Sequence, residues 1–285
     1  MAFSKKSFQI KFCKLFGFSA PTQQNFEAPL SKTLFSEALD RSVRVDLYLP
    51  PGHRRRFTRR HPCLIFNDGQ DMKAMQLAVA LRAHYGNRPK VPFVVAAVHA
   101  GDRMQEYGTA AQADYLNRGS KASQYTQFLL NELLPVLQSD YGCKSEGHSI
   151  AGCSLGGLSA FDVAWHHPDV FSKVGIFSGS LWWRSQPFRA DAPDADRIAH
   201  QMVEEHRGQR PALQFWLQAG TKDETSDRNN NGIIDAIDDT LALMSSLKSI
   251  GYPEQAMTYI EVENGEHNAA TWAKVLPDFL RWLTH

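Results

Sequence analysis

The sequence predicts a single α/β domain in which a mainly parallel sheet is covered by helices on both faces. Continuous apolar stretches, such as HPCLIF at 61–66 and VPFVVAAVH at 91–99, are typical of strands buried on both faces. Between such stretches lie segments with apolar residues at helical spacing, for example 122–139. Strands that alternate with helices along a chain favour a parallel sheet. The 285 residues fit one such domain.

The regular pattern begins near residue 30. Residues 31–37 and 43–49 alternate apolar and polar side chains, which predicts two strands, the second ended by the turn signal Pro50-Pro51-Gly52. Further strands are predicted at 61–66, 91–99, 147–152, 173–178, 213–219 and 256–262. Helices are predicted at 71–84, 122–139, 156–166, 236–250 and 270–284. Residues 182–210 are richer in proline and polar residues, and we expect them to form a small excursion from the domain.

Residues 1–29 form a basic, Phe-rich arm that precedes the domain at 30–285. Lysines interrupt its apolar residues every few positions, so the run of about 7 apolar residues of a signal peptide is missing. No stretch reaches the ~20 apolar residues of a membrane-spanning helix. The arm is expected to be an extra edge strand, a lead-in without fixed structure, or a contact with a membrane surface or a partner. These observations predict a cytoplasmic protein without an integral membrane segment.

Composition excludes several classes of function. With 31 basic and 30 acidic side chains, the formal charge of +1 provides no general attraction to nucleic acid or to anionic membranes. A hydrophobic content of 43% is that of an ordinary globular protein, not of a disordered or fibrous one. Four cysteines require no disulfide framework, and Cys63 and Cys153 lie in apolar, strand-like stretches. The oligomeric state stays open.

A nucleophile is predicted at Ser154. The sequence Gly152-Cys153-Ser154-Leu155-Gly156 matches the G-x-S-x-G nucleophile elbow, and it lies between a predicted strand and a predicted helix. This turn presents the serine at the carboxyl edge of the sheet, and the flanking glycines avoid clashes there. The alternative is an ordinary glycine-rich turn between a strand and a helix.

A serine hydroxyl needs a general base, and the base needs an acid that orients it. Among the histidines that follow the elbow, only His267 lies directly after a strand and before the final helix, so it is the predicted base. The acid is expected in the loop TKDE after the strand at 213–219, where we favour Asp223 and Glu224 is also possible. The backbone amides of Leu155 and Gln70 are the predicted donors to an oxyanion.

Other polar and aromatic side chains are candidates for substrate binding. Trp182 and Trp183 follow the strand at 173–178 and either form a wall of the pocket, which favours aromatic acyl groups, or pack in the core. A polar part of the substrate is expected near Arg103, Glu106 and Tyr107.

Residues 227–238, DRNNNGIIDAID, match a calcium loop of the EF-hand pattern, except that the twelfth position is an aspartate. Similar loops ending in aspartate occur in dockerins. The sequence therefore predicts one structural calcium ion and no organic cofactor, although a solvated turn rich in Asn and Asp is the simpler alternative. The ligands would be side-chain oxygens and one backbone carbonyl, from Asp227, Asn229, Asn231, Ile233 (carbonyl), Asp235 and Asp238.

Six motifs together resemble the putative-esterase family of α/β-hydrolases. They are DGQDM (68–72), EYGT (106–109), AGCSLGGLSA (151–160), FSGSLWW (177–183), AGTKDE (219–224) and GEHNAATW (265–272). The resemblance covers about residues 30–284, and the family includes enterobactin, feruloyl and acetylxylan esterases, S-formylglutathione hydrolases and mycolyltransferases. It implies an α/β-hydrolase fold with Ser154, Asp223 and His267 as triad. Many relatives carry His-Gly where this chain has Asp68-Gly69.

The sequence thus predicts a serine carboxyl-ester hydrolase that acts on a small-molecule ester through an acyl-enzyme. The acyl group is expected to be aromatic or linked to a siderophore or sugar. Two alternatives remain, an acyltransferase with the same triad and a non-catalytic binding protein stabilised by calcium.

Overall fold

The computed structural model describes residues 28–53, 60–86 and 91–285. At its centre lies an eight-stranded sheet of order β1-β2-β4-β3-β5-β6-β7-β8. The β1–β2 and β2–β4 pairs are antiparallel, and the other neighbours are parallel. The strands are β1 Leu30–Ser36, β2 Arg41–Tyr48, β3 Cys63–Asn67, β4 Val94–Val98, β5 His148–Cys153, β6 Phe171–Phe177, β7 Gln214–Lys222 and β8 Met257–Glu266. This is the mixed sheet of an α/β-hydrolase fold.

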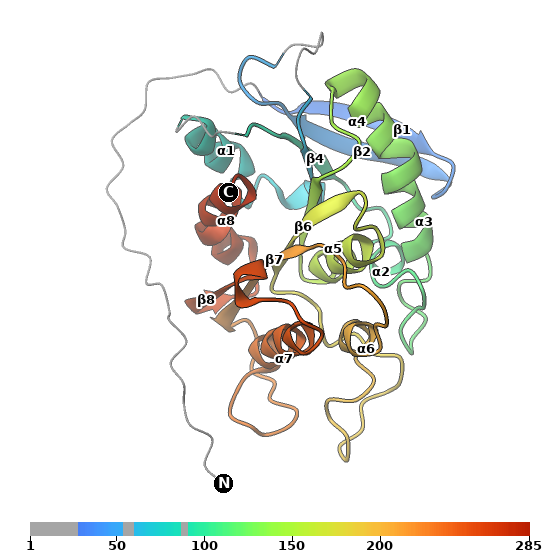
Figure 1. The fold of residues 1–285 in the computed structure, drawn as a ribbon, viewed down its shortest axis with the longest axis vertical. Helices are drawn as coiled ribbons and strands as arrows, with labels where there is room; N and C mark the ends of the chain where they lie inside the picture. The colour runs from blue at the N-terminus through green and yellow to red at the C-terminus, as the bar shows by residue number, and fades with distance from the viewer. Residues whose placement is uncertain (1–27, 54–59, 87–90) are drawn as a thin grey trace.

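Helices cover both faces of the sheet and divide the core into two parts (Figure 1). On one face α1 (Leu77–Gly86) and α8 (Ala269–Leu283) lie side by side. The opposite face is covered by α3 (Ala122–Gln127), α4 (Leu134–Tyr141), α5 (Leu155–His166), α6 (Ile198–Glu204) and α7 (Asp235–Ser249). Because both faces are buried, strands such as β3, β4 and β5 contain only buried residues.

Two of the predicted helices differ from those observed. The helix expected at 71–84 begins only at Leu77, because Gly69–Asp71 form a 3-10 turn and Gln76 adopts a left-handed φ of 55°. The helix expected at 122–139 is continuous in direction, but a π-helical segment, Phe128–Leu133, joins α3 to α4. Two short helices were not predicted, α2 (Arg103–Glu106) and α6, and the latter lies inside the 182–210 excursion.

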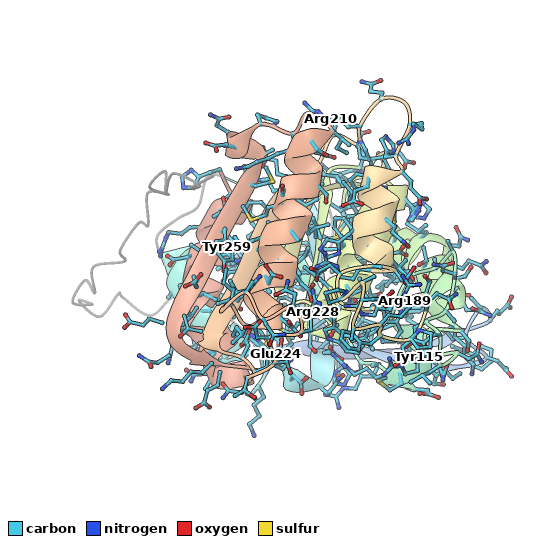
Figure 2. The ribbon with its side chains drawn as sticks, turned by 90° about the horizontal axis from the view of Figure 1, so that it is seen from below. Tyr115, Arg189, Arg210, Glu224, Arg228 and Tyr259 are labelled. Atoms are coloured by element: carbon cyan, nitrogen blue, oxygen red, sulfur yellow. The ribbon has the colours of Figure 1, made fainter. Side chains whose placement is uncertain are left out.

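The carboxyl ends of the parallel strands lie at one edge of the sheet, which is where open α/β sheets bind ligands. Ser154, Asp223 and His267 are the first residues after β5, β7 and β8, respectively. In Figure 2, Tyr115, Arg189, Glu224 and Arg228 lie at this end of the molecule, and Arg210 lies at the opposite end. The arm predicted at 1–29 lies outside the described residues apart from its last two. In the described part of the chain, no helix has the length and apolar character needed to cross a bilayer.

Candidate active site

Ser154 has the strained backbone of a nucleophile elbow. Its φ of 54° and ψ of −123° lie in a region that residues other than glycine rarely occupy. The turn is held on both sides, because the Ser154 amide donates to the Phe177 carbonyl (2.8 Å) and the Ser154 carbonyl accepts from the Ser180 amide (3.1 Å). The hydroxyl lies 3.2 Å from that of Ser180. The neighbouring thiol of Cys153 is buried, which raises its pKa well above the ordinary value, so it is a poor competitor.

The two glycines of the elbow are required by close packing. A Cβ at Gly152 would lie 2.3 Å from the Gly156 carbonyl oxygen. A Cβ at Gly156 would lie 2.7 Å from a carboxylate oxygen of Asp68. Both positions are therefore too crowded for any side chain, which explains why the motif has glycine on each side of the serine.

His267 is positioned by the tryptophan of the following helix. Its ring meets that of Trp272 edge to face, with 5.4 Å between the centroids, and the Trp272 indole donates to the Ser178 hydroxyl (3.0 Å). Burial lowers the pKa of His267, the carboxylate of Asp223 opposes this shift, and the guanidinium of Arg103 adds to it. The net shift is downward, so the ring is held in the neutral form that a general base needs.

Asp223 and Glu224 differ in their surroundings. One carboxylate oxygen of Asp223 accepts the Gly220 amide (2.9 Å), and the other is buried without a hydrogen-bond partner. Burial raises the pKa of Glu224, with the help of the nearby Asp235, and the Ala236 amide at the start of α7 bonds its carboxylate. Asp223 therefore presents a buried oxygen without a partner, and it is also the acid whose charge acts on His267.

No hydrogen bond joins the His267 ring to Ser154 or to Asp223 within the described residues. Catalytic hydrogen bonds are often long in a free enzyme and shorten when substrate binds. The structure thus brings the three predicted residues to one edge of the sheet without closing the chain of hydrogen bonds between them.

The backbone amides of Gln70 and Leu155 have no acceptor among the described residues, and neither has the amide of Gly156. Leu155 is the first residue of α5, where an N–H group has no partner within the helix. Gln70 lies in the 3-10 turn after β3, and the amides of Asp71 and Met72 next to it are bonded. The amides of Gln70 and Leu155, which the sequence predicts as oxyanion donors, therefore have no competing acceptor in the described residues.

The predicted substrate contacts fall into two groups. Trp182 is 38% exposed and lies 5.8 Å from the ring of Trp183, which is fully buried. The guanidinium of Arg118 lies against both rings. Glu106 and Tyr107 are buried and bonded within the protein, Glu106 to Arg41 and Tyr107 to the amide of Asp68. Arg103 donates two hydrogen bonds to the carboxylate of Asp68. Trp182 is thus the most open of the five.

The loop at 227–238 is closed by its own side chains. Asp227 accepts the amides of Asn231 and Gly232, and Gly232 has a φ of 83°, as a sharp turn at the sixth position requires. The Asn229 amide group donates to Asp238 (2.9 Å). Asp235 instead accepts the amide of Arg228, whose guanidinium also pairs with Asp239 of α7. Among the residues described, no three acids, histidines or cysteines are grouped to hold a metal ion.

Three residues of the site were not singled out from the sequence, namely Asp68, Ser180 and Trp272. Asp68 was noted only as a departure from the family pattern, but its buried carboxylate contacts Arg103 and the side-chain amide of Gln70. Ser180 and Trp272 lie in the motifs FSGSLWW and GEHNAATW, which were the available signal. Their roles depend on contacts between distant segments, which a motif does not specify.

Comparison with known proteins agrees with this fold. A protein of Bacillus subtilis (strain 168), the uncharacterized YbbA, is 22% identical over 84% of this chain and 92% of its own length. The enterobactin esterase of Shigella flexneri, solved with 2,3-dihydroxy-N-benzoyl-glycine, has a TM-score of 0.70 at 22% identity. The match covers 92% of this chain but only 60% of that longer esterase. A ferulic acid esterase has a TM-score of 0.69 at 17% identity and covers 91% and 99% of the two chains.

The family model described as "Putative esterase" matches residues 36–283, which is most of the chain. The matched region contains the elbow, the loops after β3, β7 and β8, and the helices on both faces of the sheet. The chain therefore belongs to the putative-esterase family of α/β-hydrolases.

Proposed function

We propose that the protein hydrolyses esters of aromatic acids through a serine acyl-enzyme, with Ser154 as nucleophile, His267 as base and Asp223 as acid. One observation carries the proposal. Ser154 has a strained backbone, and the amides of Leu155, next to it, and of Gln70, in the turn after β3, have no acceptor in the described part of the chain. Unbonded amides beside a nucleophile are what a tetrahedral oxyanion requires.

The reaction follows from this arrangement. The Ser154 hydroxyl oxygen attacks the ester carbonyl carbon while His267 takes the hydroxyl proton, and the two amides donate to the oxyanion. The tetrahedral intermediate collapses, the bond to the alcohol breaks, and His267 gives its proton to the leaving alcohol. Water then attacks the acyl-enzyme as His267 takes a proton from it, the acid leaves, and Ser154 recovers the proton. Asp223 orients the imidazole and stabilises its charged form.

Trp182 supports an aromatic acyl group as substrate. Its half-open ring is two residues along the chain from Ser180, whose hydroxyl is 3.2 Å from that of Ser154, so the segment that carries this flat apolar surface begins at the nucleophile. Aromatic groups stack on such surfaces with about 0.5–1.5 kcal/mol beyond the burial of area. One esterase that shares the fold is named for ferulic acid, and another was solved with 2,3-dihydroxy-N-benzoyl-glycine; both molecules are aromatic, which is consistent with the proposal.

The proposal is tested by turnover of a panel of esters, comprising a feruloyl, a catecholate, an acetylated sugar and a short-chain aryl ester. We expect Ser154→Ala to lose roughly 10⁴-fold or more in kcat with its fold intact. The control Ser139→Ala changes an exposed serine of α4 and should keep full activity. Unchanged turnover in Ser154→Ala would exclude the mechanism.

The same experiment separates the alternatives. Faster release of the leaving alcohol when an acceptor alcohol is added, with formation of a new ester, would identify an acyltransferase. A protein that neither turns over esters nor reacts with a fluorophosphonate would be a binding protein. Trp182→Ala should raise KM for the feruloyl ester more than for the acetylated sugar, and equal effects on both would contradict the assignment of the aromatic pocket.

We also propose that the loop at 227–238 binds one calcium ion with a structural role. Support comes from the spacing of its oxygen-bearing residues and from the turns that Asp227, Asn229 and Asn231 make with the loop amides. The ion would be held by the oxygens of Asp227, Asn229, Asn231, Ile233, Asp235 and Asp238. It would order the segment that follows Asp223 and has no part in the chemical steps.

A further inference from the structure

Arg103 lies between the two segments that carry the oxyanion amides. Its guanidinium donates to both carboxylate oxygens of Asp68, at 2.8 and 3.0 Å, and to the carbonyl oxygen of Cys153 at 3.2 Å. Asp68 precedes the turn that contains Gln70, and Cys153 precedes Ser154 and Leu155. A single side chain therefore connects the segment after β3 to the segment after β5.

Asp68, the partner of Arg103, is held in place by contacts of its own. Asp68 has a left-handed φ of 61°, is only 2% exposed, and donates its amide to the Tyr107 hydroxyl at 2.9 Å. Its carboxylate also accepts the side-chain amide of Gln70 at 2.8 Å. Burial alone would lower the pKa of Arg103, but the ion pair with Asp68 outweighs that effect and raises it. The pair is thus a charged, bidentate contact in a buried position, which is the strong kind of hydrogen bond.

The helix that bears Arg103 is itself anchored. Glu106, at the end of α2, makes a bidentate ion pair with Arg41 of β2 (2.6 Å for each contact) and accepts the Gly101 amide. Tyr107 follows directly and is fully buried. The four-residue helix α2 therefore cannot move independently of the sheet, and the backbone of Arg103 is held in place.

We propose that Arg103 is a positioning residue. By donating hydrogen bonds to both Asp68 and the Cys153 carbonyl, it sets the spacing of the Gln70 and Leu155 amides. This inference rests on the proposed esterase mechanism. It gives Arg103 a role other than the substrate contact expected from the sequence. Misplacing such donors by about 1 Å costs on the order of 100-fold in rate.

The charge of Arg103 also acts on the general base. The charged groups that influence His267 are Asp223, after β7, which favours the protonated ring, and Arg103 of α2, which disfavours it. On its own segment, Glu266 accepts the side-chain amide of Asn268. Changing the charge of the Asp68–Arg103 pair should therefore move the acidic limb of the kcat/KM pH profile. A purely structural role of Arg103 would leave that limb unchanged.

The test compares variants of the full chain by kcat, KM and the pH profile with an aryl ester. Arg103→Lys keeps the charge but not the fork of donors, so we expect kcat about 10- to 100-fold lower, KM little changed and the acidic limb unmoved. Asp68→Asn leaves the guanidinium uncompensated and should move the limb to lower pH. The double variant Asp68→Asn with Arg103→Met removes both charges and should move it to higher pH. Arg82→Met, on the exposed side of α1, is the control and should match the parent.

The double variant leaves no buried unpaired charge, so it tests the proposal even where a single variant folds poorly. A parent-like kcat in Arg103→Lys, or a limb that stays fixed in both Asp68 variants, would overturn the role of Arg103 while Ser154→Ala remains inactive. Full activity of Ser154→Ala in the same assay would overturn the proposed mechanism, and this inference with it.

Discussion

Gly220 and Gly265 lie so close that a Cβ at Gly220 would be 2.4 Å from the Gly265 carbonyl oxygen and 2.8 Å from a carboxylate oxygen of Asp223. These glycines lie near the ends of β7 and β8, the strands that lead to the proposed acid and the proposed base. Their contact brings the two strand ends together at the point where the triad residues leave the sheet. The distance between Asp223 and His267 therefore depends on both positions being glycine, without a Cβ.

Gly220→Ala should therefore lower both stability and activity. Overpacking of this kind costs about 1–3 kcal/mol, and the displaced Asp223 should reduce kcat more than KM. Gly208→Ala is a matched control, since that glycine has a φ of 111° but no atom within 4 Å of its Cβ position, so the variant carries backbone strain without a clash. Urea unfolding and steady-state kinetics measure the two effects. A Gly220→Ala enzyme with parent-like kcat would show that the spacing of the strands is not critical.

Asp223 and Glu224 are separated by conservative substitutions. Asp223→Asn retains the shape of the side chain but not its charge, and should lower kcat by about 10³- to 10⁴-fold. Glu224→Gln should leave kcat within a few-fold, because that carboxylate lies at the start of α7 and away from His267. The reverse order of effects would assign the acid to Glu224.

Stability should fall in mild acid because buried histidines are held neutral. Burial lowers the pKa of His200 to about 4, and nearby Arg197 adds to the shift. The unfolded chain binds a proton near pH 6.5, so the stability is complete above that pH and is lost as the pH falls towards about 4. The loss for one such group is at most about 3 kcal/mol. His200→Gln should flatten the pH dependence of the urea midpoint between pH 7.5 and 5, whereas exposed His285→Gln should not.

Calcium binding is tested by calorimetry on protein treated with chelator. We expect one site, and we expect added calcium to raise Tm and to restore activity lost on chelation. Asp227→Asn should abolish the heat of binding, whereas Asp191→Asn, in the exposed excursion, should not. A chelator that changes neither Tm nor activity would show that the loop is closed by its own hydrogen bonds and by Arg228 instead.

The sheet could be predicted from the sequence because its strands have a clear hydrophobic pattern. In β3 and β4 every residue is buried, so Cys63–Phe66 and Val94–Val98 are continuous apolar stretches. The start of α1 could not be predicted in this way. Residues 71–76 are apolar enough for a helix, but Gln76 adopts a left-handed conformation that only the tertiary structure specifies.

The candidate site likewise contains residues whose positions the sequence predicts and residues whose roles it does not. Ser154 and His267 follow strand ends and carry local motifs, so their positions could be predicted. The role of Glu106 could not be predicted. The sequence suggests a contact with a polar part of the substrate, whereas Glu106 is buried and pairs with Arg41, which is 65 residues away. Ion pairs between distant segments have no spacing rule. They become visible only when the fold brings the two segments together, here β2 and α2.

The pair formed by Asp68 and Arg103 also has an evolutionary consequence. The resemblance to the esterase family implies histidine at the position of Asp68 in many relatives, and a histidine cannot offer a guanidinium two carboxylate oxygens. A lineage that exchanged one residue alone would pass through a protein with an uncompensated charge beside its oxyanion turn. Positions 68 and 103 should therefore covary, so that arginine accompanies aspartate and is replaced where histidine occurs.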